Sequence, residues 1–202
     1  PDDSDFHIFR AYFYFKIMQN FDEAEKGYNN AVKLDEEEYI SRADFYMLTG
    51  QNKKAISDYK KFIQTDIDPI EGYNKRGFYY YFIGDYDNAS NDFNTVLSKD
   101  TNDRHVYRYM AFVLEKKGKL EEAKKMYEKA INKDENDPNG YYHLAKFYQA
   151  NNKILKAYKN FNKSLEKLNG IGDYRIYDKN NETIYACEIH LAISKFYMGG
   201  FE

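Results

Sequence analysis

Apolar residues recur along this chain at spacings of three, four and seven, which is the periodicity of one face of an α-helix. Short polar turns interrupt the pattern, and each turn leads to an alanine. These alanines are Ala24, Ala55, Ala89, Ala123 and Ala157. Their separations of 31, 34, 34 and 34 residues indicate that one helix-turn-helix unit occurs five times in succession.

The periodicity predicts two helices in each unit. We expect first helices over 5–18, 37–49, 70–83, 104–117 and 138–150. Second helices are expected over 21–34, 52–65, 86–99, 120–133 and 154–168. The alanine lets the two helices approach closely, and an aromatic four residues later fills the gap beside it. Between the helices, a residue in the left-handed conformation is expected to end the first helix, as a glycine does most easily.

Helix starts are marked by acidic residues and proline. Asp68-Pro69 and Asp137-Pro138 each supply a capping carboxylate followed by a proline in the first turn. The run Asp35-Glu36-Glu37-Glu38 lies at the start of another first helix, where negative charge suits the helix dipole. These signals support the helix boundaries inferred from the periodicity.

Residues 77–89, GFYYYFIGDYDNA, resemble the core signature of the tetratricopeptide repeat family, and residues 104–137 carry another strong copy. The resemblance covers about residues 5–168 and implies an all-α fold, a right-handed superhelix (solenoid) of five repeats plus a partial sixth. One domain over 1–202 would hold repeats at 5–35, 36–69, 70–103, 104–137 and 138–169, a loop at 170–181, and a partial repeat or capping helix at 182–202. Arg42 and Arg76 depart from the family, because they occupy a position that is often Leu.

In this family the first helices line a concave groove, and helix phase indicates which residues face it here. This groove set is Phe6, Phe9, Phe13, Ile40, Asp44, Met47, Asn74, Phe78, Tyr81, Arg108, Tyr109, Phe112, Tyr142, His143 and Lys146. So many aromatics are unusual on a free surface, where large apolar patches mark contacts. The alternative is that some of these aromatics pack between repeats.

The amino-acid composition excludes several classes of protein. Aromatics are 18% of the chain, as 22 Tyr and 15 Phe without Trp, while 31% of residues are charged and the mean hydropathy is −0.87. Disordered chains are short of aromatics, and no run of about 18 apolar residues marks a membrane span. A net charge of −3 does not favour a nucleic acid partner. The chain begins with Pro rather than Met, so a removed targeting segment stays possible and the compartment is cytoplasmic only by default.

Candidates for catalysis or metal binding are few. His105 and His143 lie on adjacent first helices, but two histidines without a carboxylate pair make a poor metal site. Cys187, the single cysteine, cannot form an internal disulfide and has no oriented base to make it a nucleophile. No glycine-rich phosphate loop is present. We therefore predict no enzymatic activity, no cofactor and no metal.

The resemblance implies a protein-interaction module that holds a partner peptide or helix in its groove, without nucleic acid binding or direct membrane insertion. Two alternatives remain open at this point. The chain could self-assemble as a homo-oligomer, with a segment of one molecule in the groove of another. It could also be the recognition arm of a larger enzyme whose catalytic domain lies outside these residues.

Overall fold

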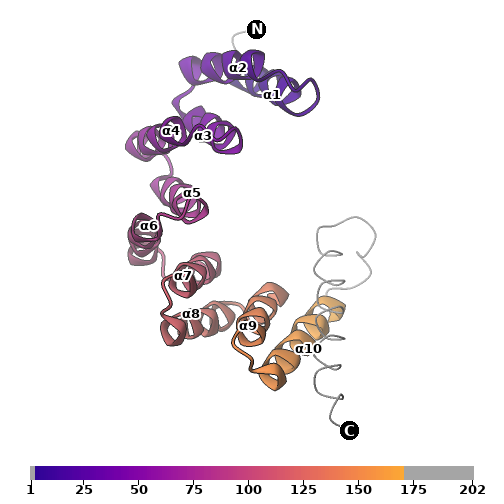
Figure 1. Cartoon of the computed structure of the whole chain (residues 1–202). Coiled ribbons are helices and arrows are strands. Elements are labelled where there is room, and N and C mark those ends of the chain that lie inside the picture. The colour runs from indigo at the N-terminus through magenta and orange to yellow at the C-terminus, as the bar shows by residue number, and fades with distance from the viewer. Residues whose placement is uncertain (1–2, 171–202) are drawn as a thin grey trace. The chain divides into compact units, whose positions relative to one another are not determined.

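The structure, a computed structural model, describes residues 3–170 as α-helices joined by short turns (Figure 1). The first helices of the repeats are α1 (Ser4–Lys16), α3 (Tyr39–Leu48), α5 (Pro69–Phe82), α7 (Arg104–Lys116) and α9 (Pro138–Ala150). The second helices are α2 (Phe21–Leu34), α4 (Asn52–Thr65), α6 (Tyr86–Lys99), α8 (Leu120–Lys133) and α10 (Ile154–Gly170). All ten predicted helices are present, with boundaries within two residues of those expected, which confirms the all-α repeat solenoid.

Several boundaries differ from the prediction by one or two residues. A 3-10 helix, η1 (Glu36–Glu38), precedes α3, because the Asp35 carboxylate accepts a hydrogen bond from the Glu37 amide at 2.8 Å and tightens the first turn. Helix α10 continues to Gly170, two residues further than expected. The rest of the expected loop, the partial repeat at 182–202 and Cys187 lie outside the described residues.

The chain divides into two compact units, Pro1–Lys99 and Asp100–Glu202. In unit 1, α1 packs on α2, α3 on α4, and α5 on α6; in unit 2, α7 packs on α8 and α9 on α10. Neighbouring pairs within a unit are joined where a second helix contacts the next first helix, as α4 does with α5 and α8 with α9. Each helix pair corresponds to one predicted repeat.

The repeat alanine sets the distance between the two helices of a pair. All five alanines are fully buried. The aromatic four residues later is buried as well, in every repeat: Tyr28, Tyr59, Phe93, Tyr127 and Phe161. In the first pair, α1 and α2 approach so closely that a Cβ added to Gly27 would lie 2.7 Å from the Ala11 Cβ. The predicted roles of the alanine and the aromatic are therefore confirmed.

Each turn inside a repeat contains one residue with positive φ. The five residues are Gln19 (50°), Gly50 (72°), Gly84 (83°), Gly118 (72°) and Asn152 (57°). The next amide then bonds back to the first helix, as Asp85 N does to Tyr80 O at 2.8 Å and Lys119 N to Leu114 O at 2.9 Å. The same turn closes all five repeats, although only three of them have the glycine that adopts this conformation without strain.

Two repeats of unit 1 contain a buried ion pair between their helices. Arg42 donates from Nε and Nη2 to the Asp58 carboxylate at 2.6 and 3.0 Å, and Arg76 makes the same two bonds to Asp92 at 2.8 Å each. Both aspartates are buried. Each guanidinium also lies against two tyrosine rings, with centroids at 5.4 and 5.8 Å in both repeats.

The ion pairs explain the arginines at a position that is often Leu in the family. At the equivalent positions of the fourth repeat, 34 residues beyond Arg76 and Asp92, stand Met110 and Met126. Met110 is buried and Met126 half-buried. A bidentate ion pair and an apolar pair thus occupy the same place between the two helices of a repeat.

Replacing Gln19 by Gly should stabilise the protein by about 0.5–1 kcal/mol, because a non-glycine residue in the left-handed conformation costs about 1–2 kcal/mol, partly offset by the larger unfolded-state entropy of glycine. Urea unfolding followed by circular dichroism measures the change. Gln51→Gly is the matched control, since φ is −85° there and glycine offers no advantage. Equal destabilisation by both substitutions would contradict the argument.

Asp92→Ala should destabilise the protein by about 3 kcal/mol, because Arg76 is left inside the repeat without its carboxylate. The double variant Arg76→Met/Asp92→Met should remain within about 1 kcal/mol of the wild type, since a well-packed apolar pair can replace a buried ion pair. Thermal and urea unfolding test both variants. If the double variant were as unstable as the single one, the ion pair would be stabilising in its own right.

Candidate peptide-binding face

The first helices of unit 1 expose large apolar side chains on one face. Counted from the repeat alanine, these residues fall at three equivalent positions of the repeat. They are Phe9 and Phe13 on α1 and Ile17 directly after it, Leu48 on α3, and Phe78 and Phe82 on α5. Their exposure ranges from 39% for Phe78 to 72% for Phe9. We call these six residues the apolar face; Phe9, Phe13 and Phe78 belong to the groove set predicted from the sequence.

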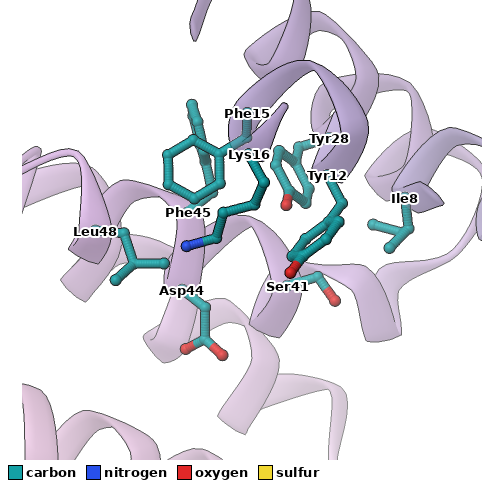
Figure 2. Close-up of a pocket in the computed structure, with 9 residues that line it drawn as sticks. All are labelled: Ile8, Tyr12, Phe15, Lys16, Tyr28, Ser41, Asp44, Phe45 and Leu48. Atoms are coloured by element: carbon teal, nitrogen blue, oxygen red, sulfur yellow. The ribbon is translucent and has the colours of Figure 1, made fainter. Parts of the chain in front are cut away.

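A pocket of about 290 Å³ opens between α1 and α3 (Figure 2). It is lined by Ile8, Tyr12, Phe15, Lys16, Tyr28, Ser41, Asp44, Phe45 and Leu48. Figure 2 shows the Lys16 side chain crossing the pocket, with its amino group on the side of Asp44. The volume is at the lower end of the range of small-molecule sites, which is room for one large side chain of a partner.

Asp44 is held in place at the pocket by two donors. The Tyr59 hydroxyl donates to Asp44 Oδ1 at 2.5 Å, and Lys75 Nζ donates to Oδ2 at 2.7 Å. Burial, followed by the Asp44 charge, raises the pKa of Tyr28 to about 12, so this pocket-lining hydroxyl stays protonated. The pocket therefore combines apolar walls with a fixed carboxylate and the hydroxyls of Tyr12 and Ser41.

The other unit 1 members of the groove set are half-buried, with one exception. Ile40, Met47, Asn74 and Tyr81 are half-buried, whereas Phe6 is exposed. The Tyr81 ring lies 6.5 Å from that of Phe78 and 6.0 Å from that of Tyr86, centroid to centroid. Within unit 1, then, the groove set divides into exposed phenylalanines and half-buried residues.

In unit 2 the groove set is buried or half-buried, except for the exposed Lys146. Arg108 is buried, and it donates from Nη1 to Asp137 Oδ2 at 3.3 Å and from Nη2 to His105 Nδ1 at 2.8 Å. Burial, followed by the charges of Arg108 and Arg104, lowers the pKa of His105. The two candidate histidines thus do not form a pair: His105 bonds Arg108, while His143 packs on Phe112.

Aromatic contacts join the two helix pairs of unit 2. Phe112 contacts the His143 ring at 5.0 Å and the Tyr127 ring at 5.9 Å, both edge to face. The half-buried Tyr109 ring lies 6.2 Å from Phe112. Tyr142 lies against Phe161, with Lys146 Nζ 5.7 Å from the Tyr142 ring centroid. Here the aromatics predicted for the groove also pack between repeats.

The surroundings of His143 keep its imidazole neutral. Burial, followed by the positive charges of Arg108 and Lys146, lowers its pKa from 6.5 to about 3. A neutral ring suits its contacts with Phe112 and Tyr142. His143 therefore acts as a packing residue at neutral pH.

Two models of one family match the sequence. The model described as tetratricopeptide repeat matches residues 39–66, and that described as TPR repeat matches residues 116–152. The first match lies within α3 and α4, and the second begins at the end of α7 and runs through α8 into α9. The chain is a tetratricopeptide repeat protein.

Solved structures similar to this tetratricopeptide repeat protein support the same architecture. A MamA crystal structure is 22% identical, with a TM-score of 0.64, and the match covers 87% of this chain and 97% of that one. PilF from Pseudomonas aeruginosa is 15% identical, with a TM-score of 0.67 and coverage of 98% and 91%. YrrB, described as a TPR protein with an unusual peptide-binding site, is 16% identical, with a TM-score of 0.57 and coverage of 82% and 87%.

At these identities the likeness to solved structures establishes the fold alone, and among curated proteins no significant sequence match is found. Tetratricopeptide repeats are protein-interaction scaffolds, and this is the function class of the chain. Among residues 3–170, no three His, Cys, Asp or Glu side chains are grouped to hold a metal ion. No helix in the same range combines the length and apolar character needed to cross a membrane.

Sequence reasoning did not identify most of the pocket. Of its lining residues, Asp44 belongs to the predicted groove set, and Tyr28 was expected only as the aromatic beside the repeat alanine. The spacing of four between Tyr12 and Lys16 places both on one face of α1, but it does not indicate that this face meets α3.

The lowered pKa of His143 predicts a loss of stability in acid. Its contribution is complete above the unfolded-state pKa of 6.5 and is lost as the pH falls toward 3, because the unfolded state binds a proton that the folded state excludes. From pH 7 to pH 5, we expect the wild type to lose about 1–2 kcal/mol more unfolding free energy than His143→Gln. Urea unfolding at both pH values measures this. Between pH 7 and pH 9 the two proteins should change in parallel, and parallel behaviour down to pH 5 would contradict the assignment.

Proposed function

We propose that the protein binds an extended peptide or a helix of a partner protein on the apolar face of unit 1, with one side chain of the partner in the pocket between α1 and α3. The single observation that carries this proposal is the exposure of six large apolar residues at equivalent positions of three successive first helices. Exposed large apolar side chains gathered on one face of a protein mark contact sites.

The energetics favour such a contact. Removing apolar surface from water contributes about 25 cal/mol per Å², and the most exposed members of the face, Phe9, Ile17 and Phe82, have the most area to bury. The row of apolar residues along successive first helices suits a partner that presents side chains at regular intervals. The Asp44 carboxylate and the hydroxyls in the pocket offer acceptors and donors for polar groups of that partner.

We place the apolar anchors in unit 1 because the equivalent positions of α7 and α9 differ in chemistry. These positions hold Arg108, Phe112 and Lys116 on α7, and Tyr142, Lys146 and Ala150 on α9. Arg108 is buried, Phe112 and Tyr142 are half-buried, and the exposed members are Lys or Ala. In this proposal the unit 2 residues of the groove set supply no apolar anchor.

A selection of short random peptides displayed on phage against the full chain tests the proposal. The selected peptides should bind the wild type and lose at least about tenfold in affinity against Phe9→Ser/Leu48→Ser/Phe82→Ser, because three apolar contacts are removed from the centre and ends of the face. Fluorescence anisotropy with synthetic copies of the peptides measures the dissociation constants.

The matched control is Leu120→Ser/Leu155→Ser, which removes exposed apolar residues from second helices of unit 2 and should leave the affinity unchanged. Unchanged affinity in the triple variant, with circular dichroism showing an intact fold, would overturn the proposal. If light scattering showed a wild-type oligomer that the triple variant dissociates, the face would instead be a self-association surface.

A further inference from the structure

We infer that the partner segment is basic and amphipathic, with lysine or arginine side chains at the end of the apolar face where α1, α3 and α5 begin. This inference rests on the proposed function and adds the chemistry of the partner to it. The observation behind it is a set of carboxylates at those helix starts, which we call the acidic edge: Asp5, Glu36, Glu37, Glu38 and Glu71.

The acidic edge borders the pocket and the apolar face. Ile8 of α1 and Ser41 of α3 both line the pocket, so the turns that precede them lie at the same end of it. Asp5 stands three residues before Ile8, and Glu38 stands three residues before Ser41. A partner lying across the apolar face therefore meets carboxylates at this end.

No cation within the described residues 3–170 forms an ion pair with the acidic edge. Arg10, Arg42, Lys75 and Arg76 of the unit 1 first helices are each paired with a carboxylate elsewhere. Like charges also act on one another at this edge. The pKa of Glu38 is raised, first by burial and then by the negative charges of Asp35, Asp5 and Glu37. A cation brought by a partner would relieve this repulsion.

Helix capping does not account for the edge. Asp3, Asp35 and Asp68 already cap the helix starts with their side chains, so the five edge carboxylates are additional. The edge lies 17 to 19 residues before the repeat alanine, and at these positions the first helices of unit 2 have Arg104, His105, Val106, Pro138, Asn139 and Gly140. Negative charge at this position is thus a property of unit 1, which is also the unit with the exposed apolar residues.

The apolar face and the acidic edge occur in the same unit, and together they indicate the kind of partner. Apolar surface alone would accept many hydrophobic segments, whereas carboxylates along one end select for charge and fix the direction of the segment. An acidic or phosphorylated segment would be repelled there. Of the first-helix cations in unit 1, Lys16 alone lacks a carboxylate partner among residues 3–170, and it lies in the pocket, away from the edge.

The phage-displayed random peptide library tests the inference through the composition of the selected peptides. Against the wild-type chain, selected peptides should be enriched in both apolar and basic residues relative to the unselected library. Against Glu36→Lys/Glu37→Lys/Glu71→Lys, the basic enrichment should disappear while the apolar enrichment persists. The control Glu121→Lys/Glu135→Lys, which reverses exposed charges in unit 2, should select peptides like those of the wild type.

Affinity measurements on one selected basic peptide provide a second readout. Its dissociation constant should rise about fivefold or more in the triple charge-reversal variant, and should also rise when NaCl is increased from about 50 to about 300 mM, because salt screens exposed charges. Apolar peptides without basic enrichment, or an affinity insensitive to salt and to charge reversal, would overturn the basic partner and leave the proposed function standing. Absence of any selected peptide would overturn both.

Discussion

The close approach of two helices at a fully buried alanine is the constraint on which the rest of the structure depends. Each repeat alanine has no exposed surface, and a buried aromatic four residues later fills the space that the small side chain leaves. A left-handed residue five positions before the alanine turns the chain back at the same point in every repeat. Because these few positions determine the helix pair, most of the remaining surface is free to differ between repeats.

The two units differ in the residues at the positions of the apolar face. In unit 1, six of the nine residues at the three positions of the apolar face are apolar and exposed, and carboxylates precede them. In unit 2, the equivalent aromatic residues make ring contacts: Phe112 with His143 of the next helix pair, and Tyr142 with Phe161 of its own helix pair. The same arrangement of helices therefore carries exposed apolar residues in one unit and more buried, more polar residues in the other.

The sequence predicted the helices well because their determinants are local: apolar spacing, caps and turn residues lie within a few positions of the boundary they set. It predicted the side-chain environments less well, since these depend on residues distant in the sequence. Arg108 is buried because Asp137, 29 residues later, accepts its hydrogen bond. The recurrence of Asp sixteen residues after both Arg42 and Arg76 was the available signal for the ion pairs. The pocket had no comparable signal, because it depends on the relative placement of α1 and α3.

The ion pairs also bear on how the chain avoids pairing the wrong helices during folding. Repeats are alike, so a first helix could dock on the second helix of another repeat, a known route to misfolding in repeat proteins. If α3 docked on α8, Arg42 would face Met126 and be desolvated without a carboxylate; if α7 docked on α4, Asp58 would face Met110 and lose its arginine. Both errors strand a charge inside the protein. The Arg42–Asp58 and Arg76–Asp92 pairs therefore disfavour the docking of helices from the second and third repeats on helices of the fourth.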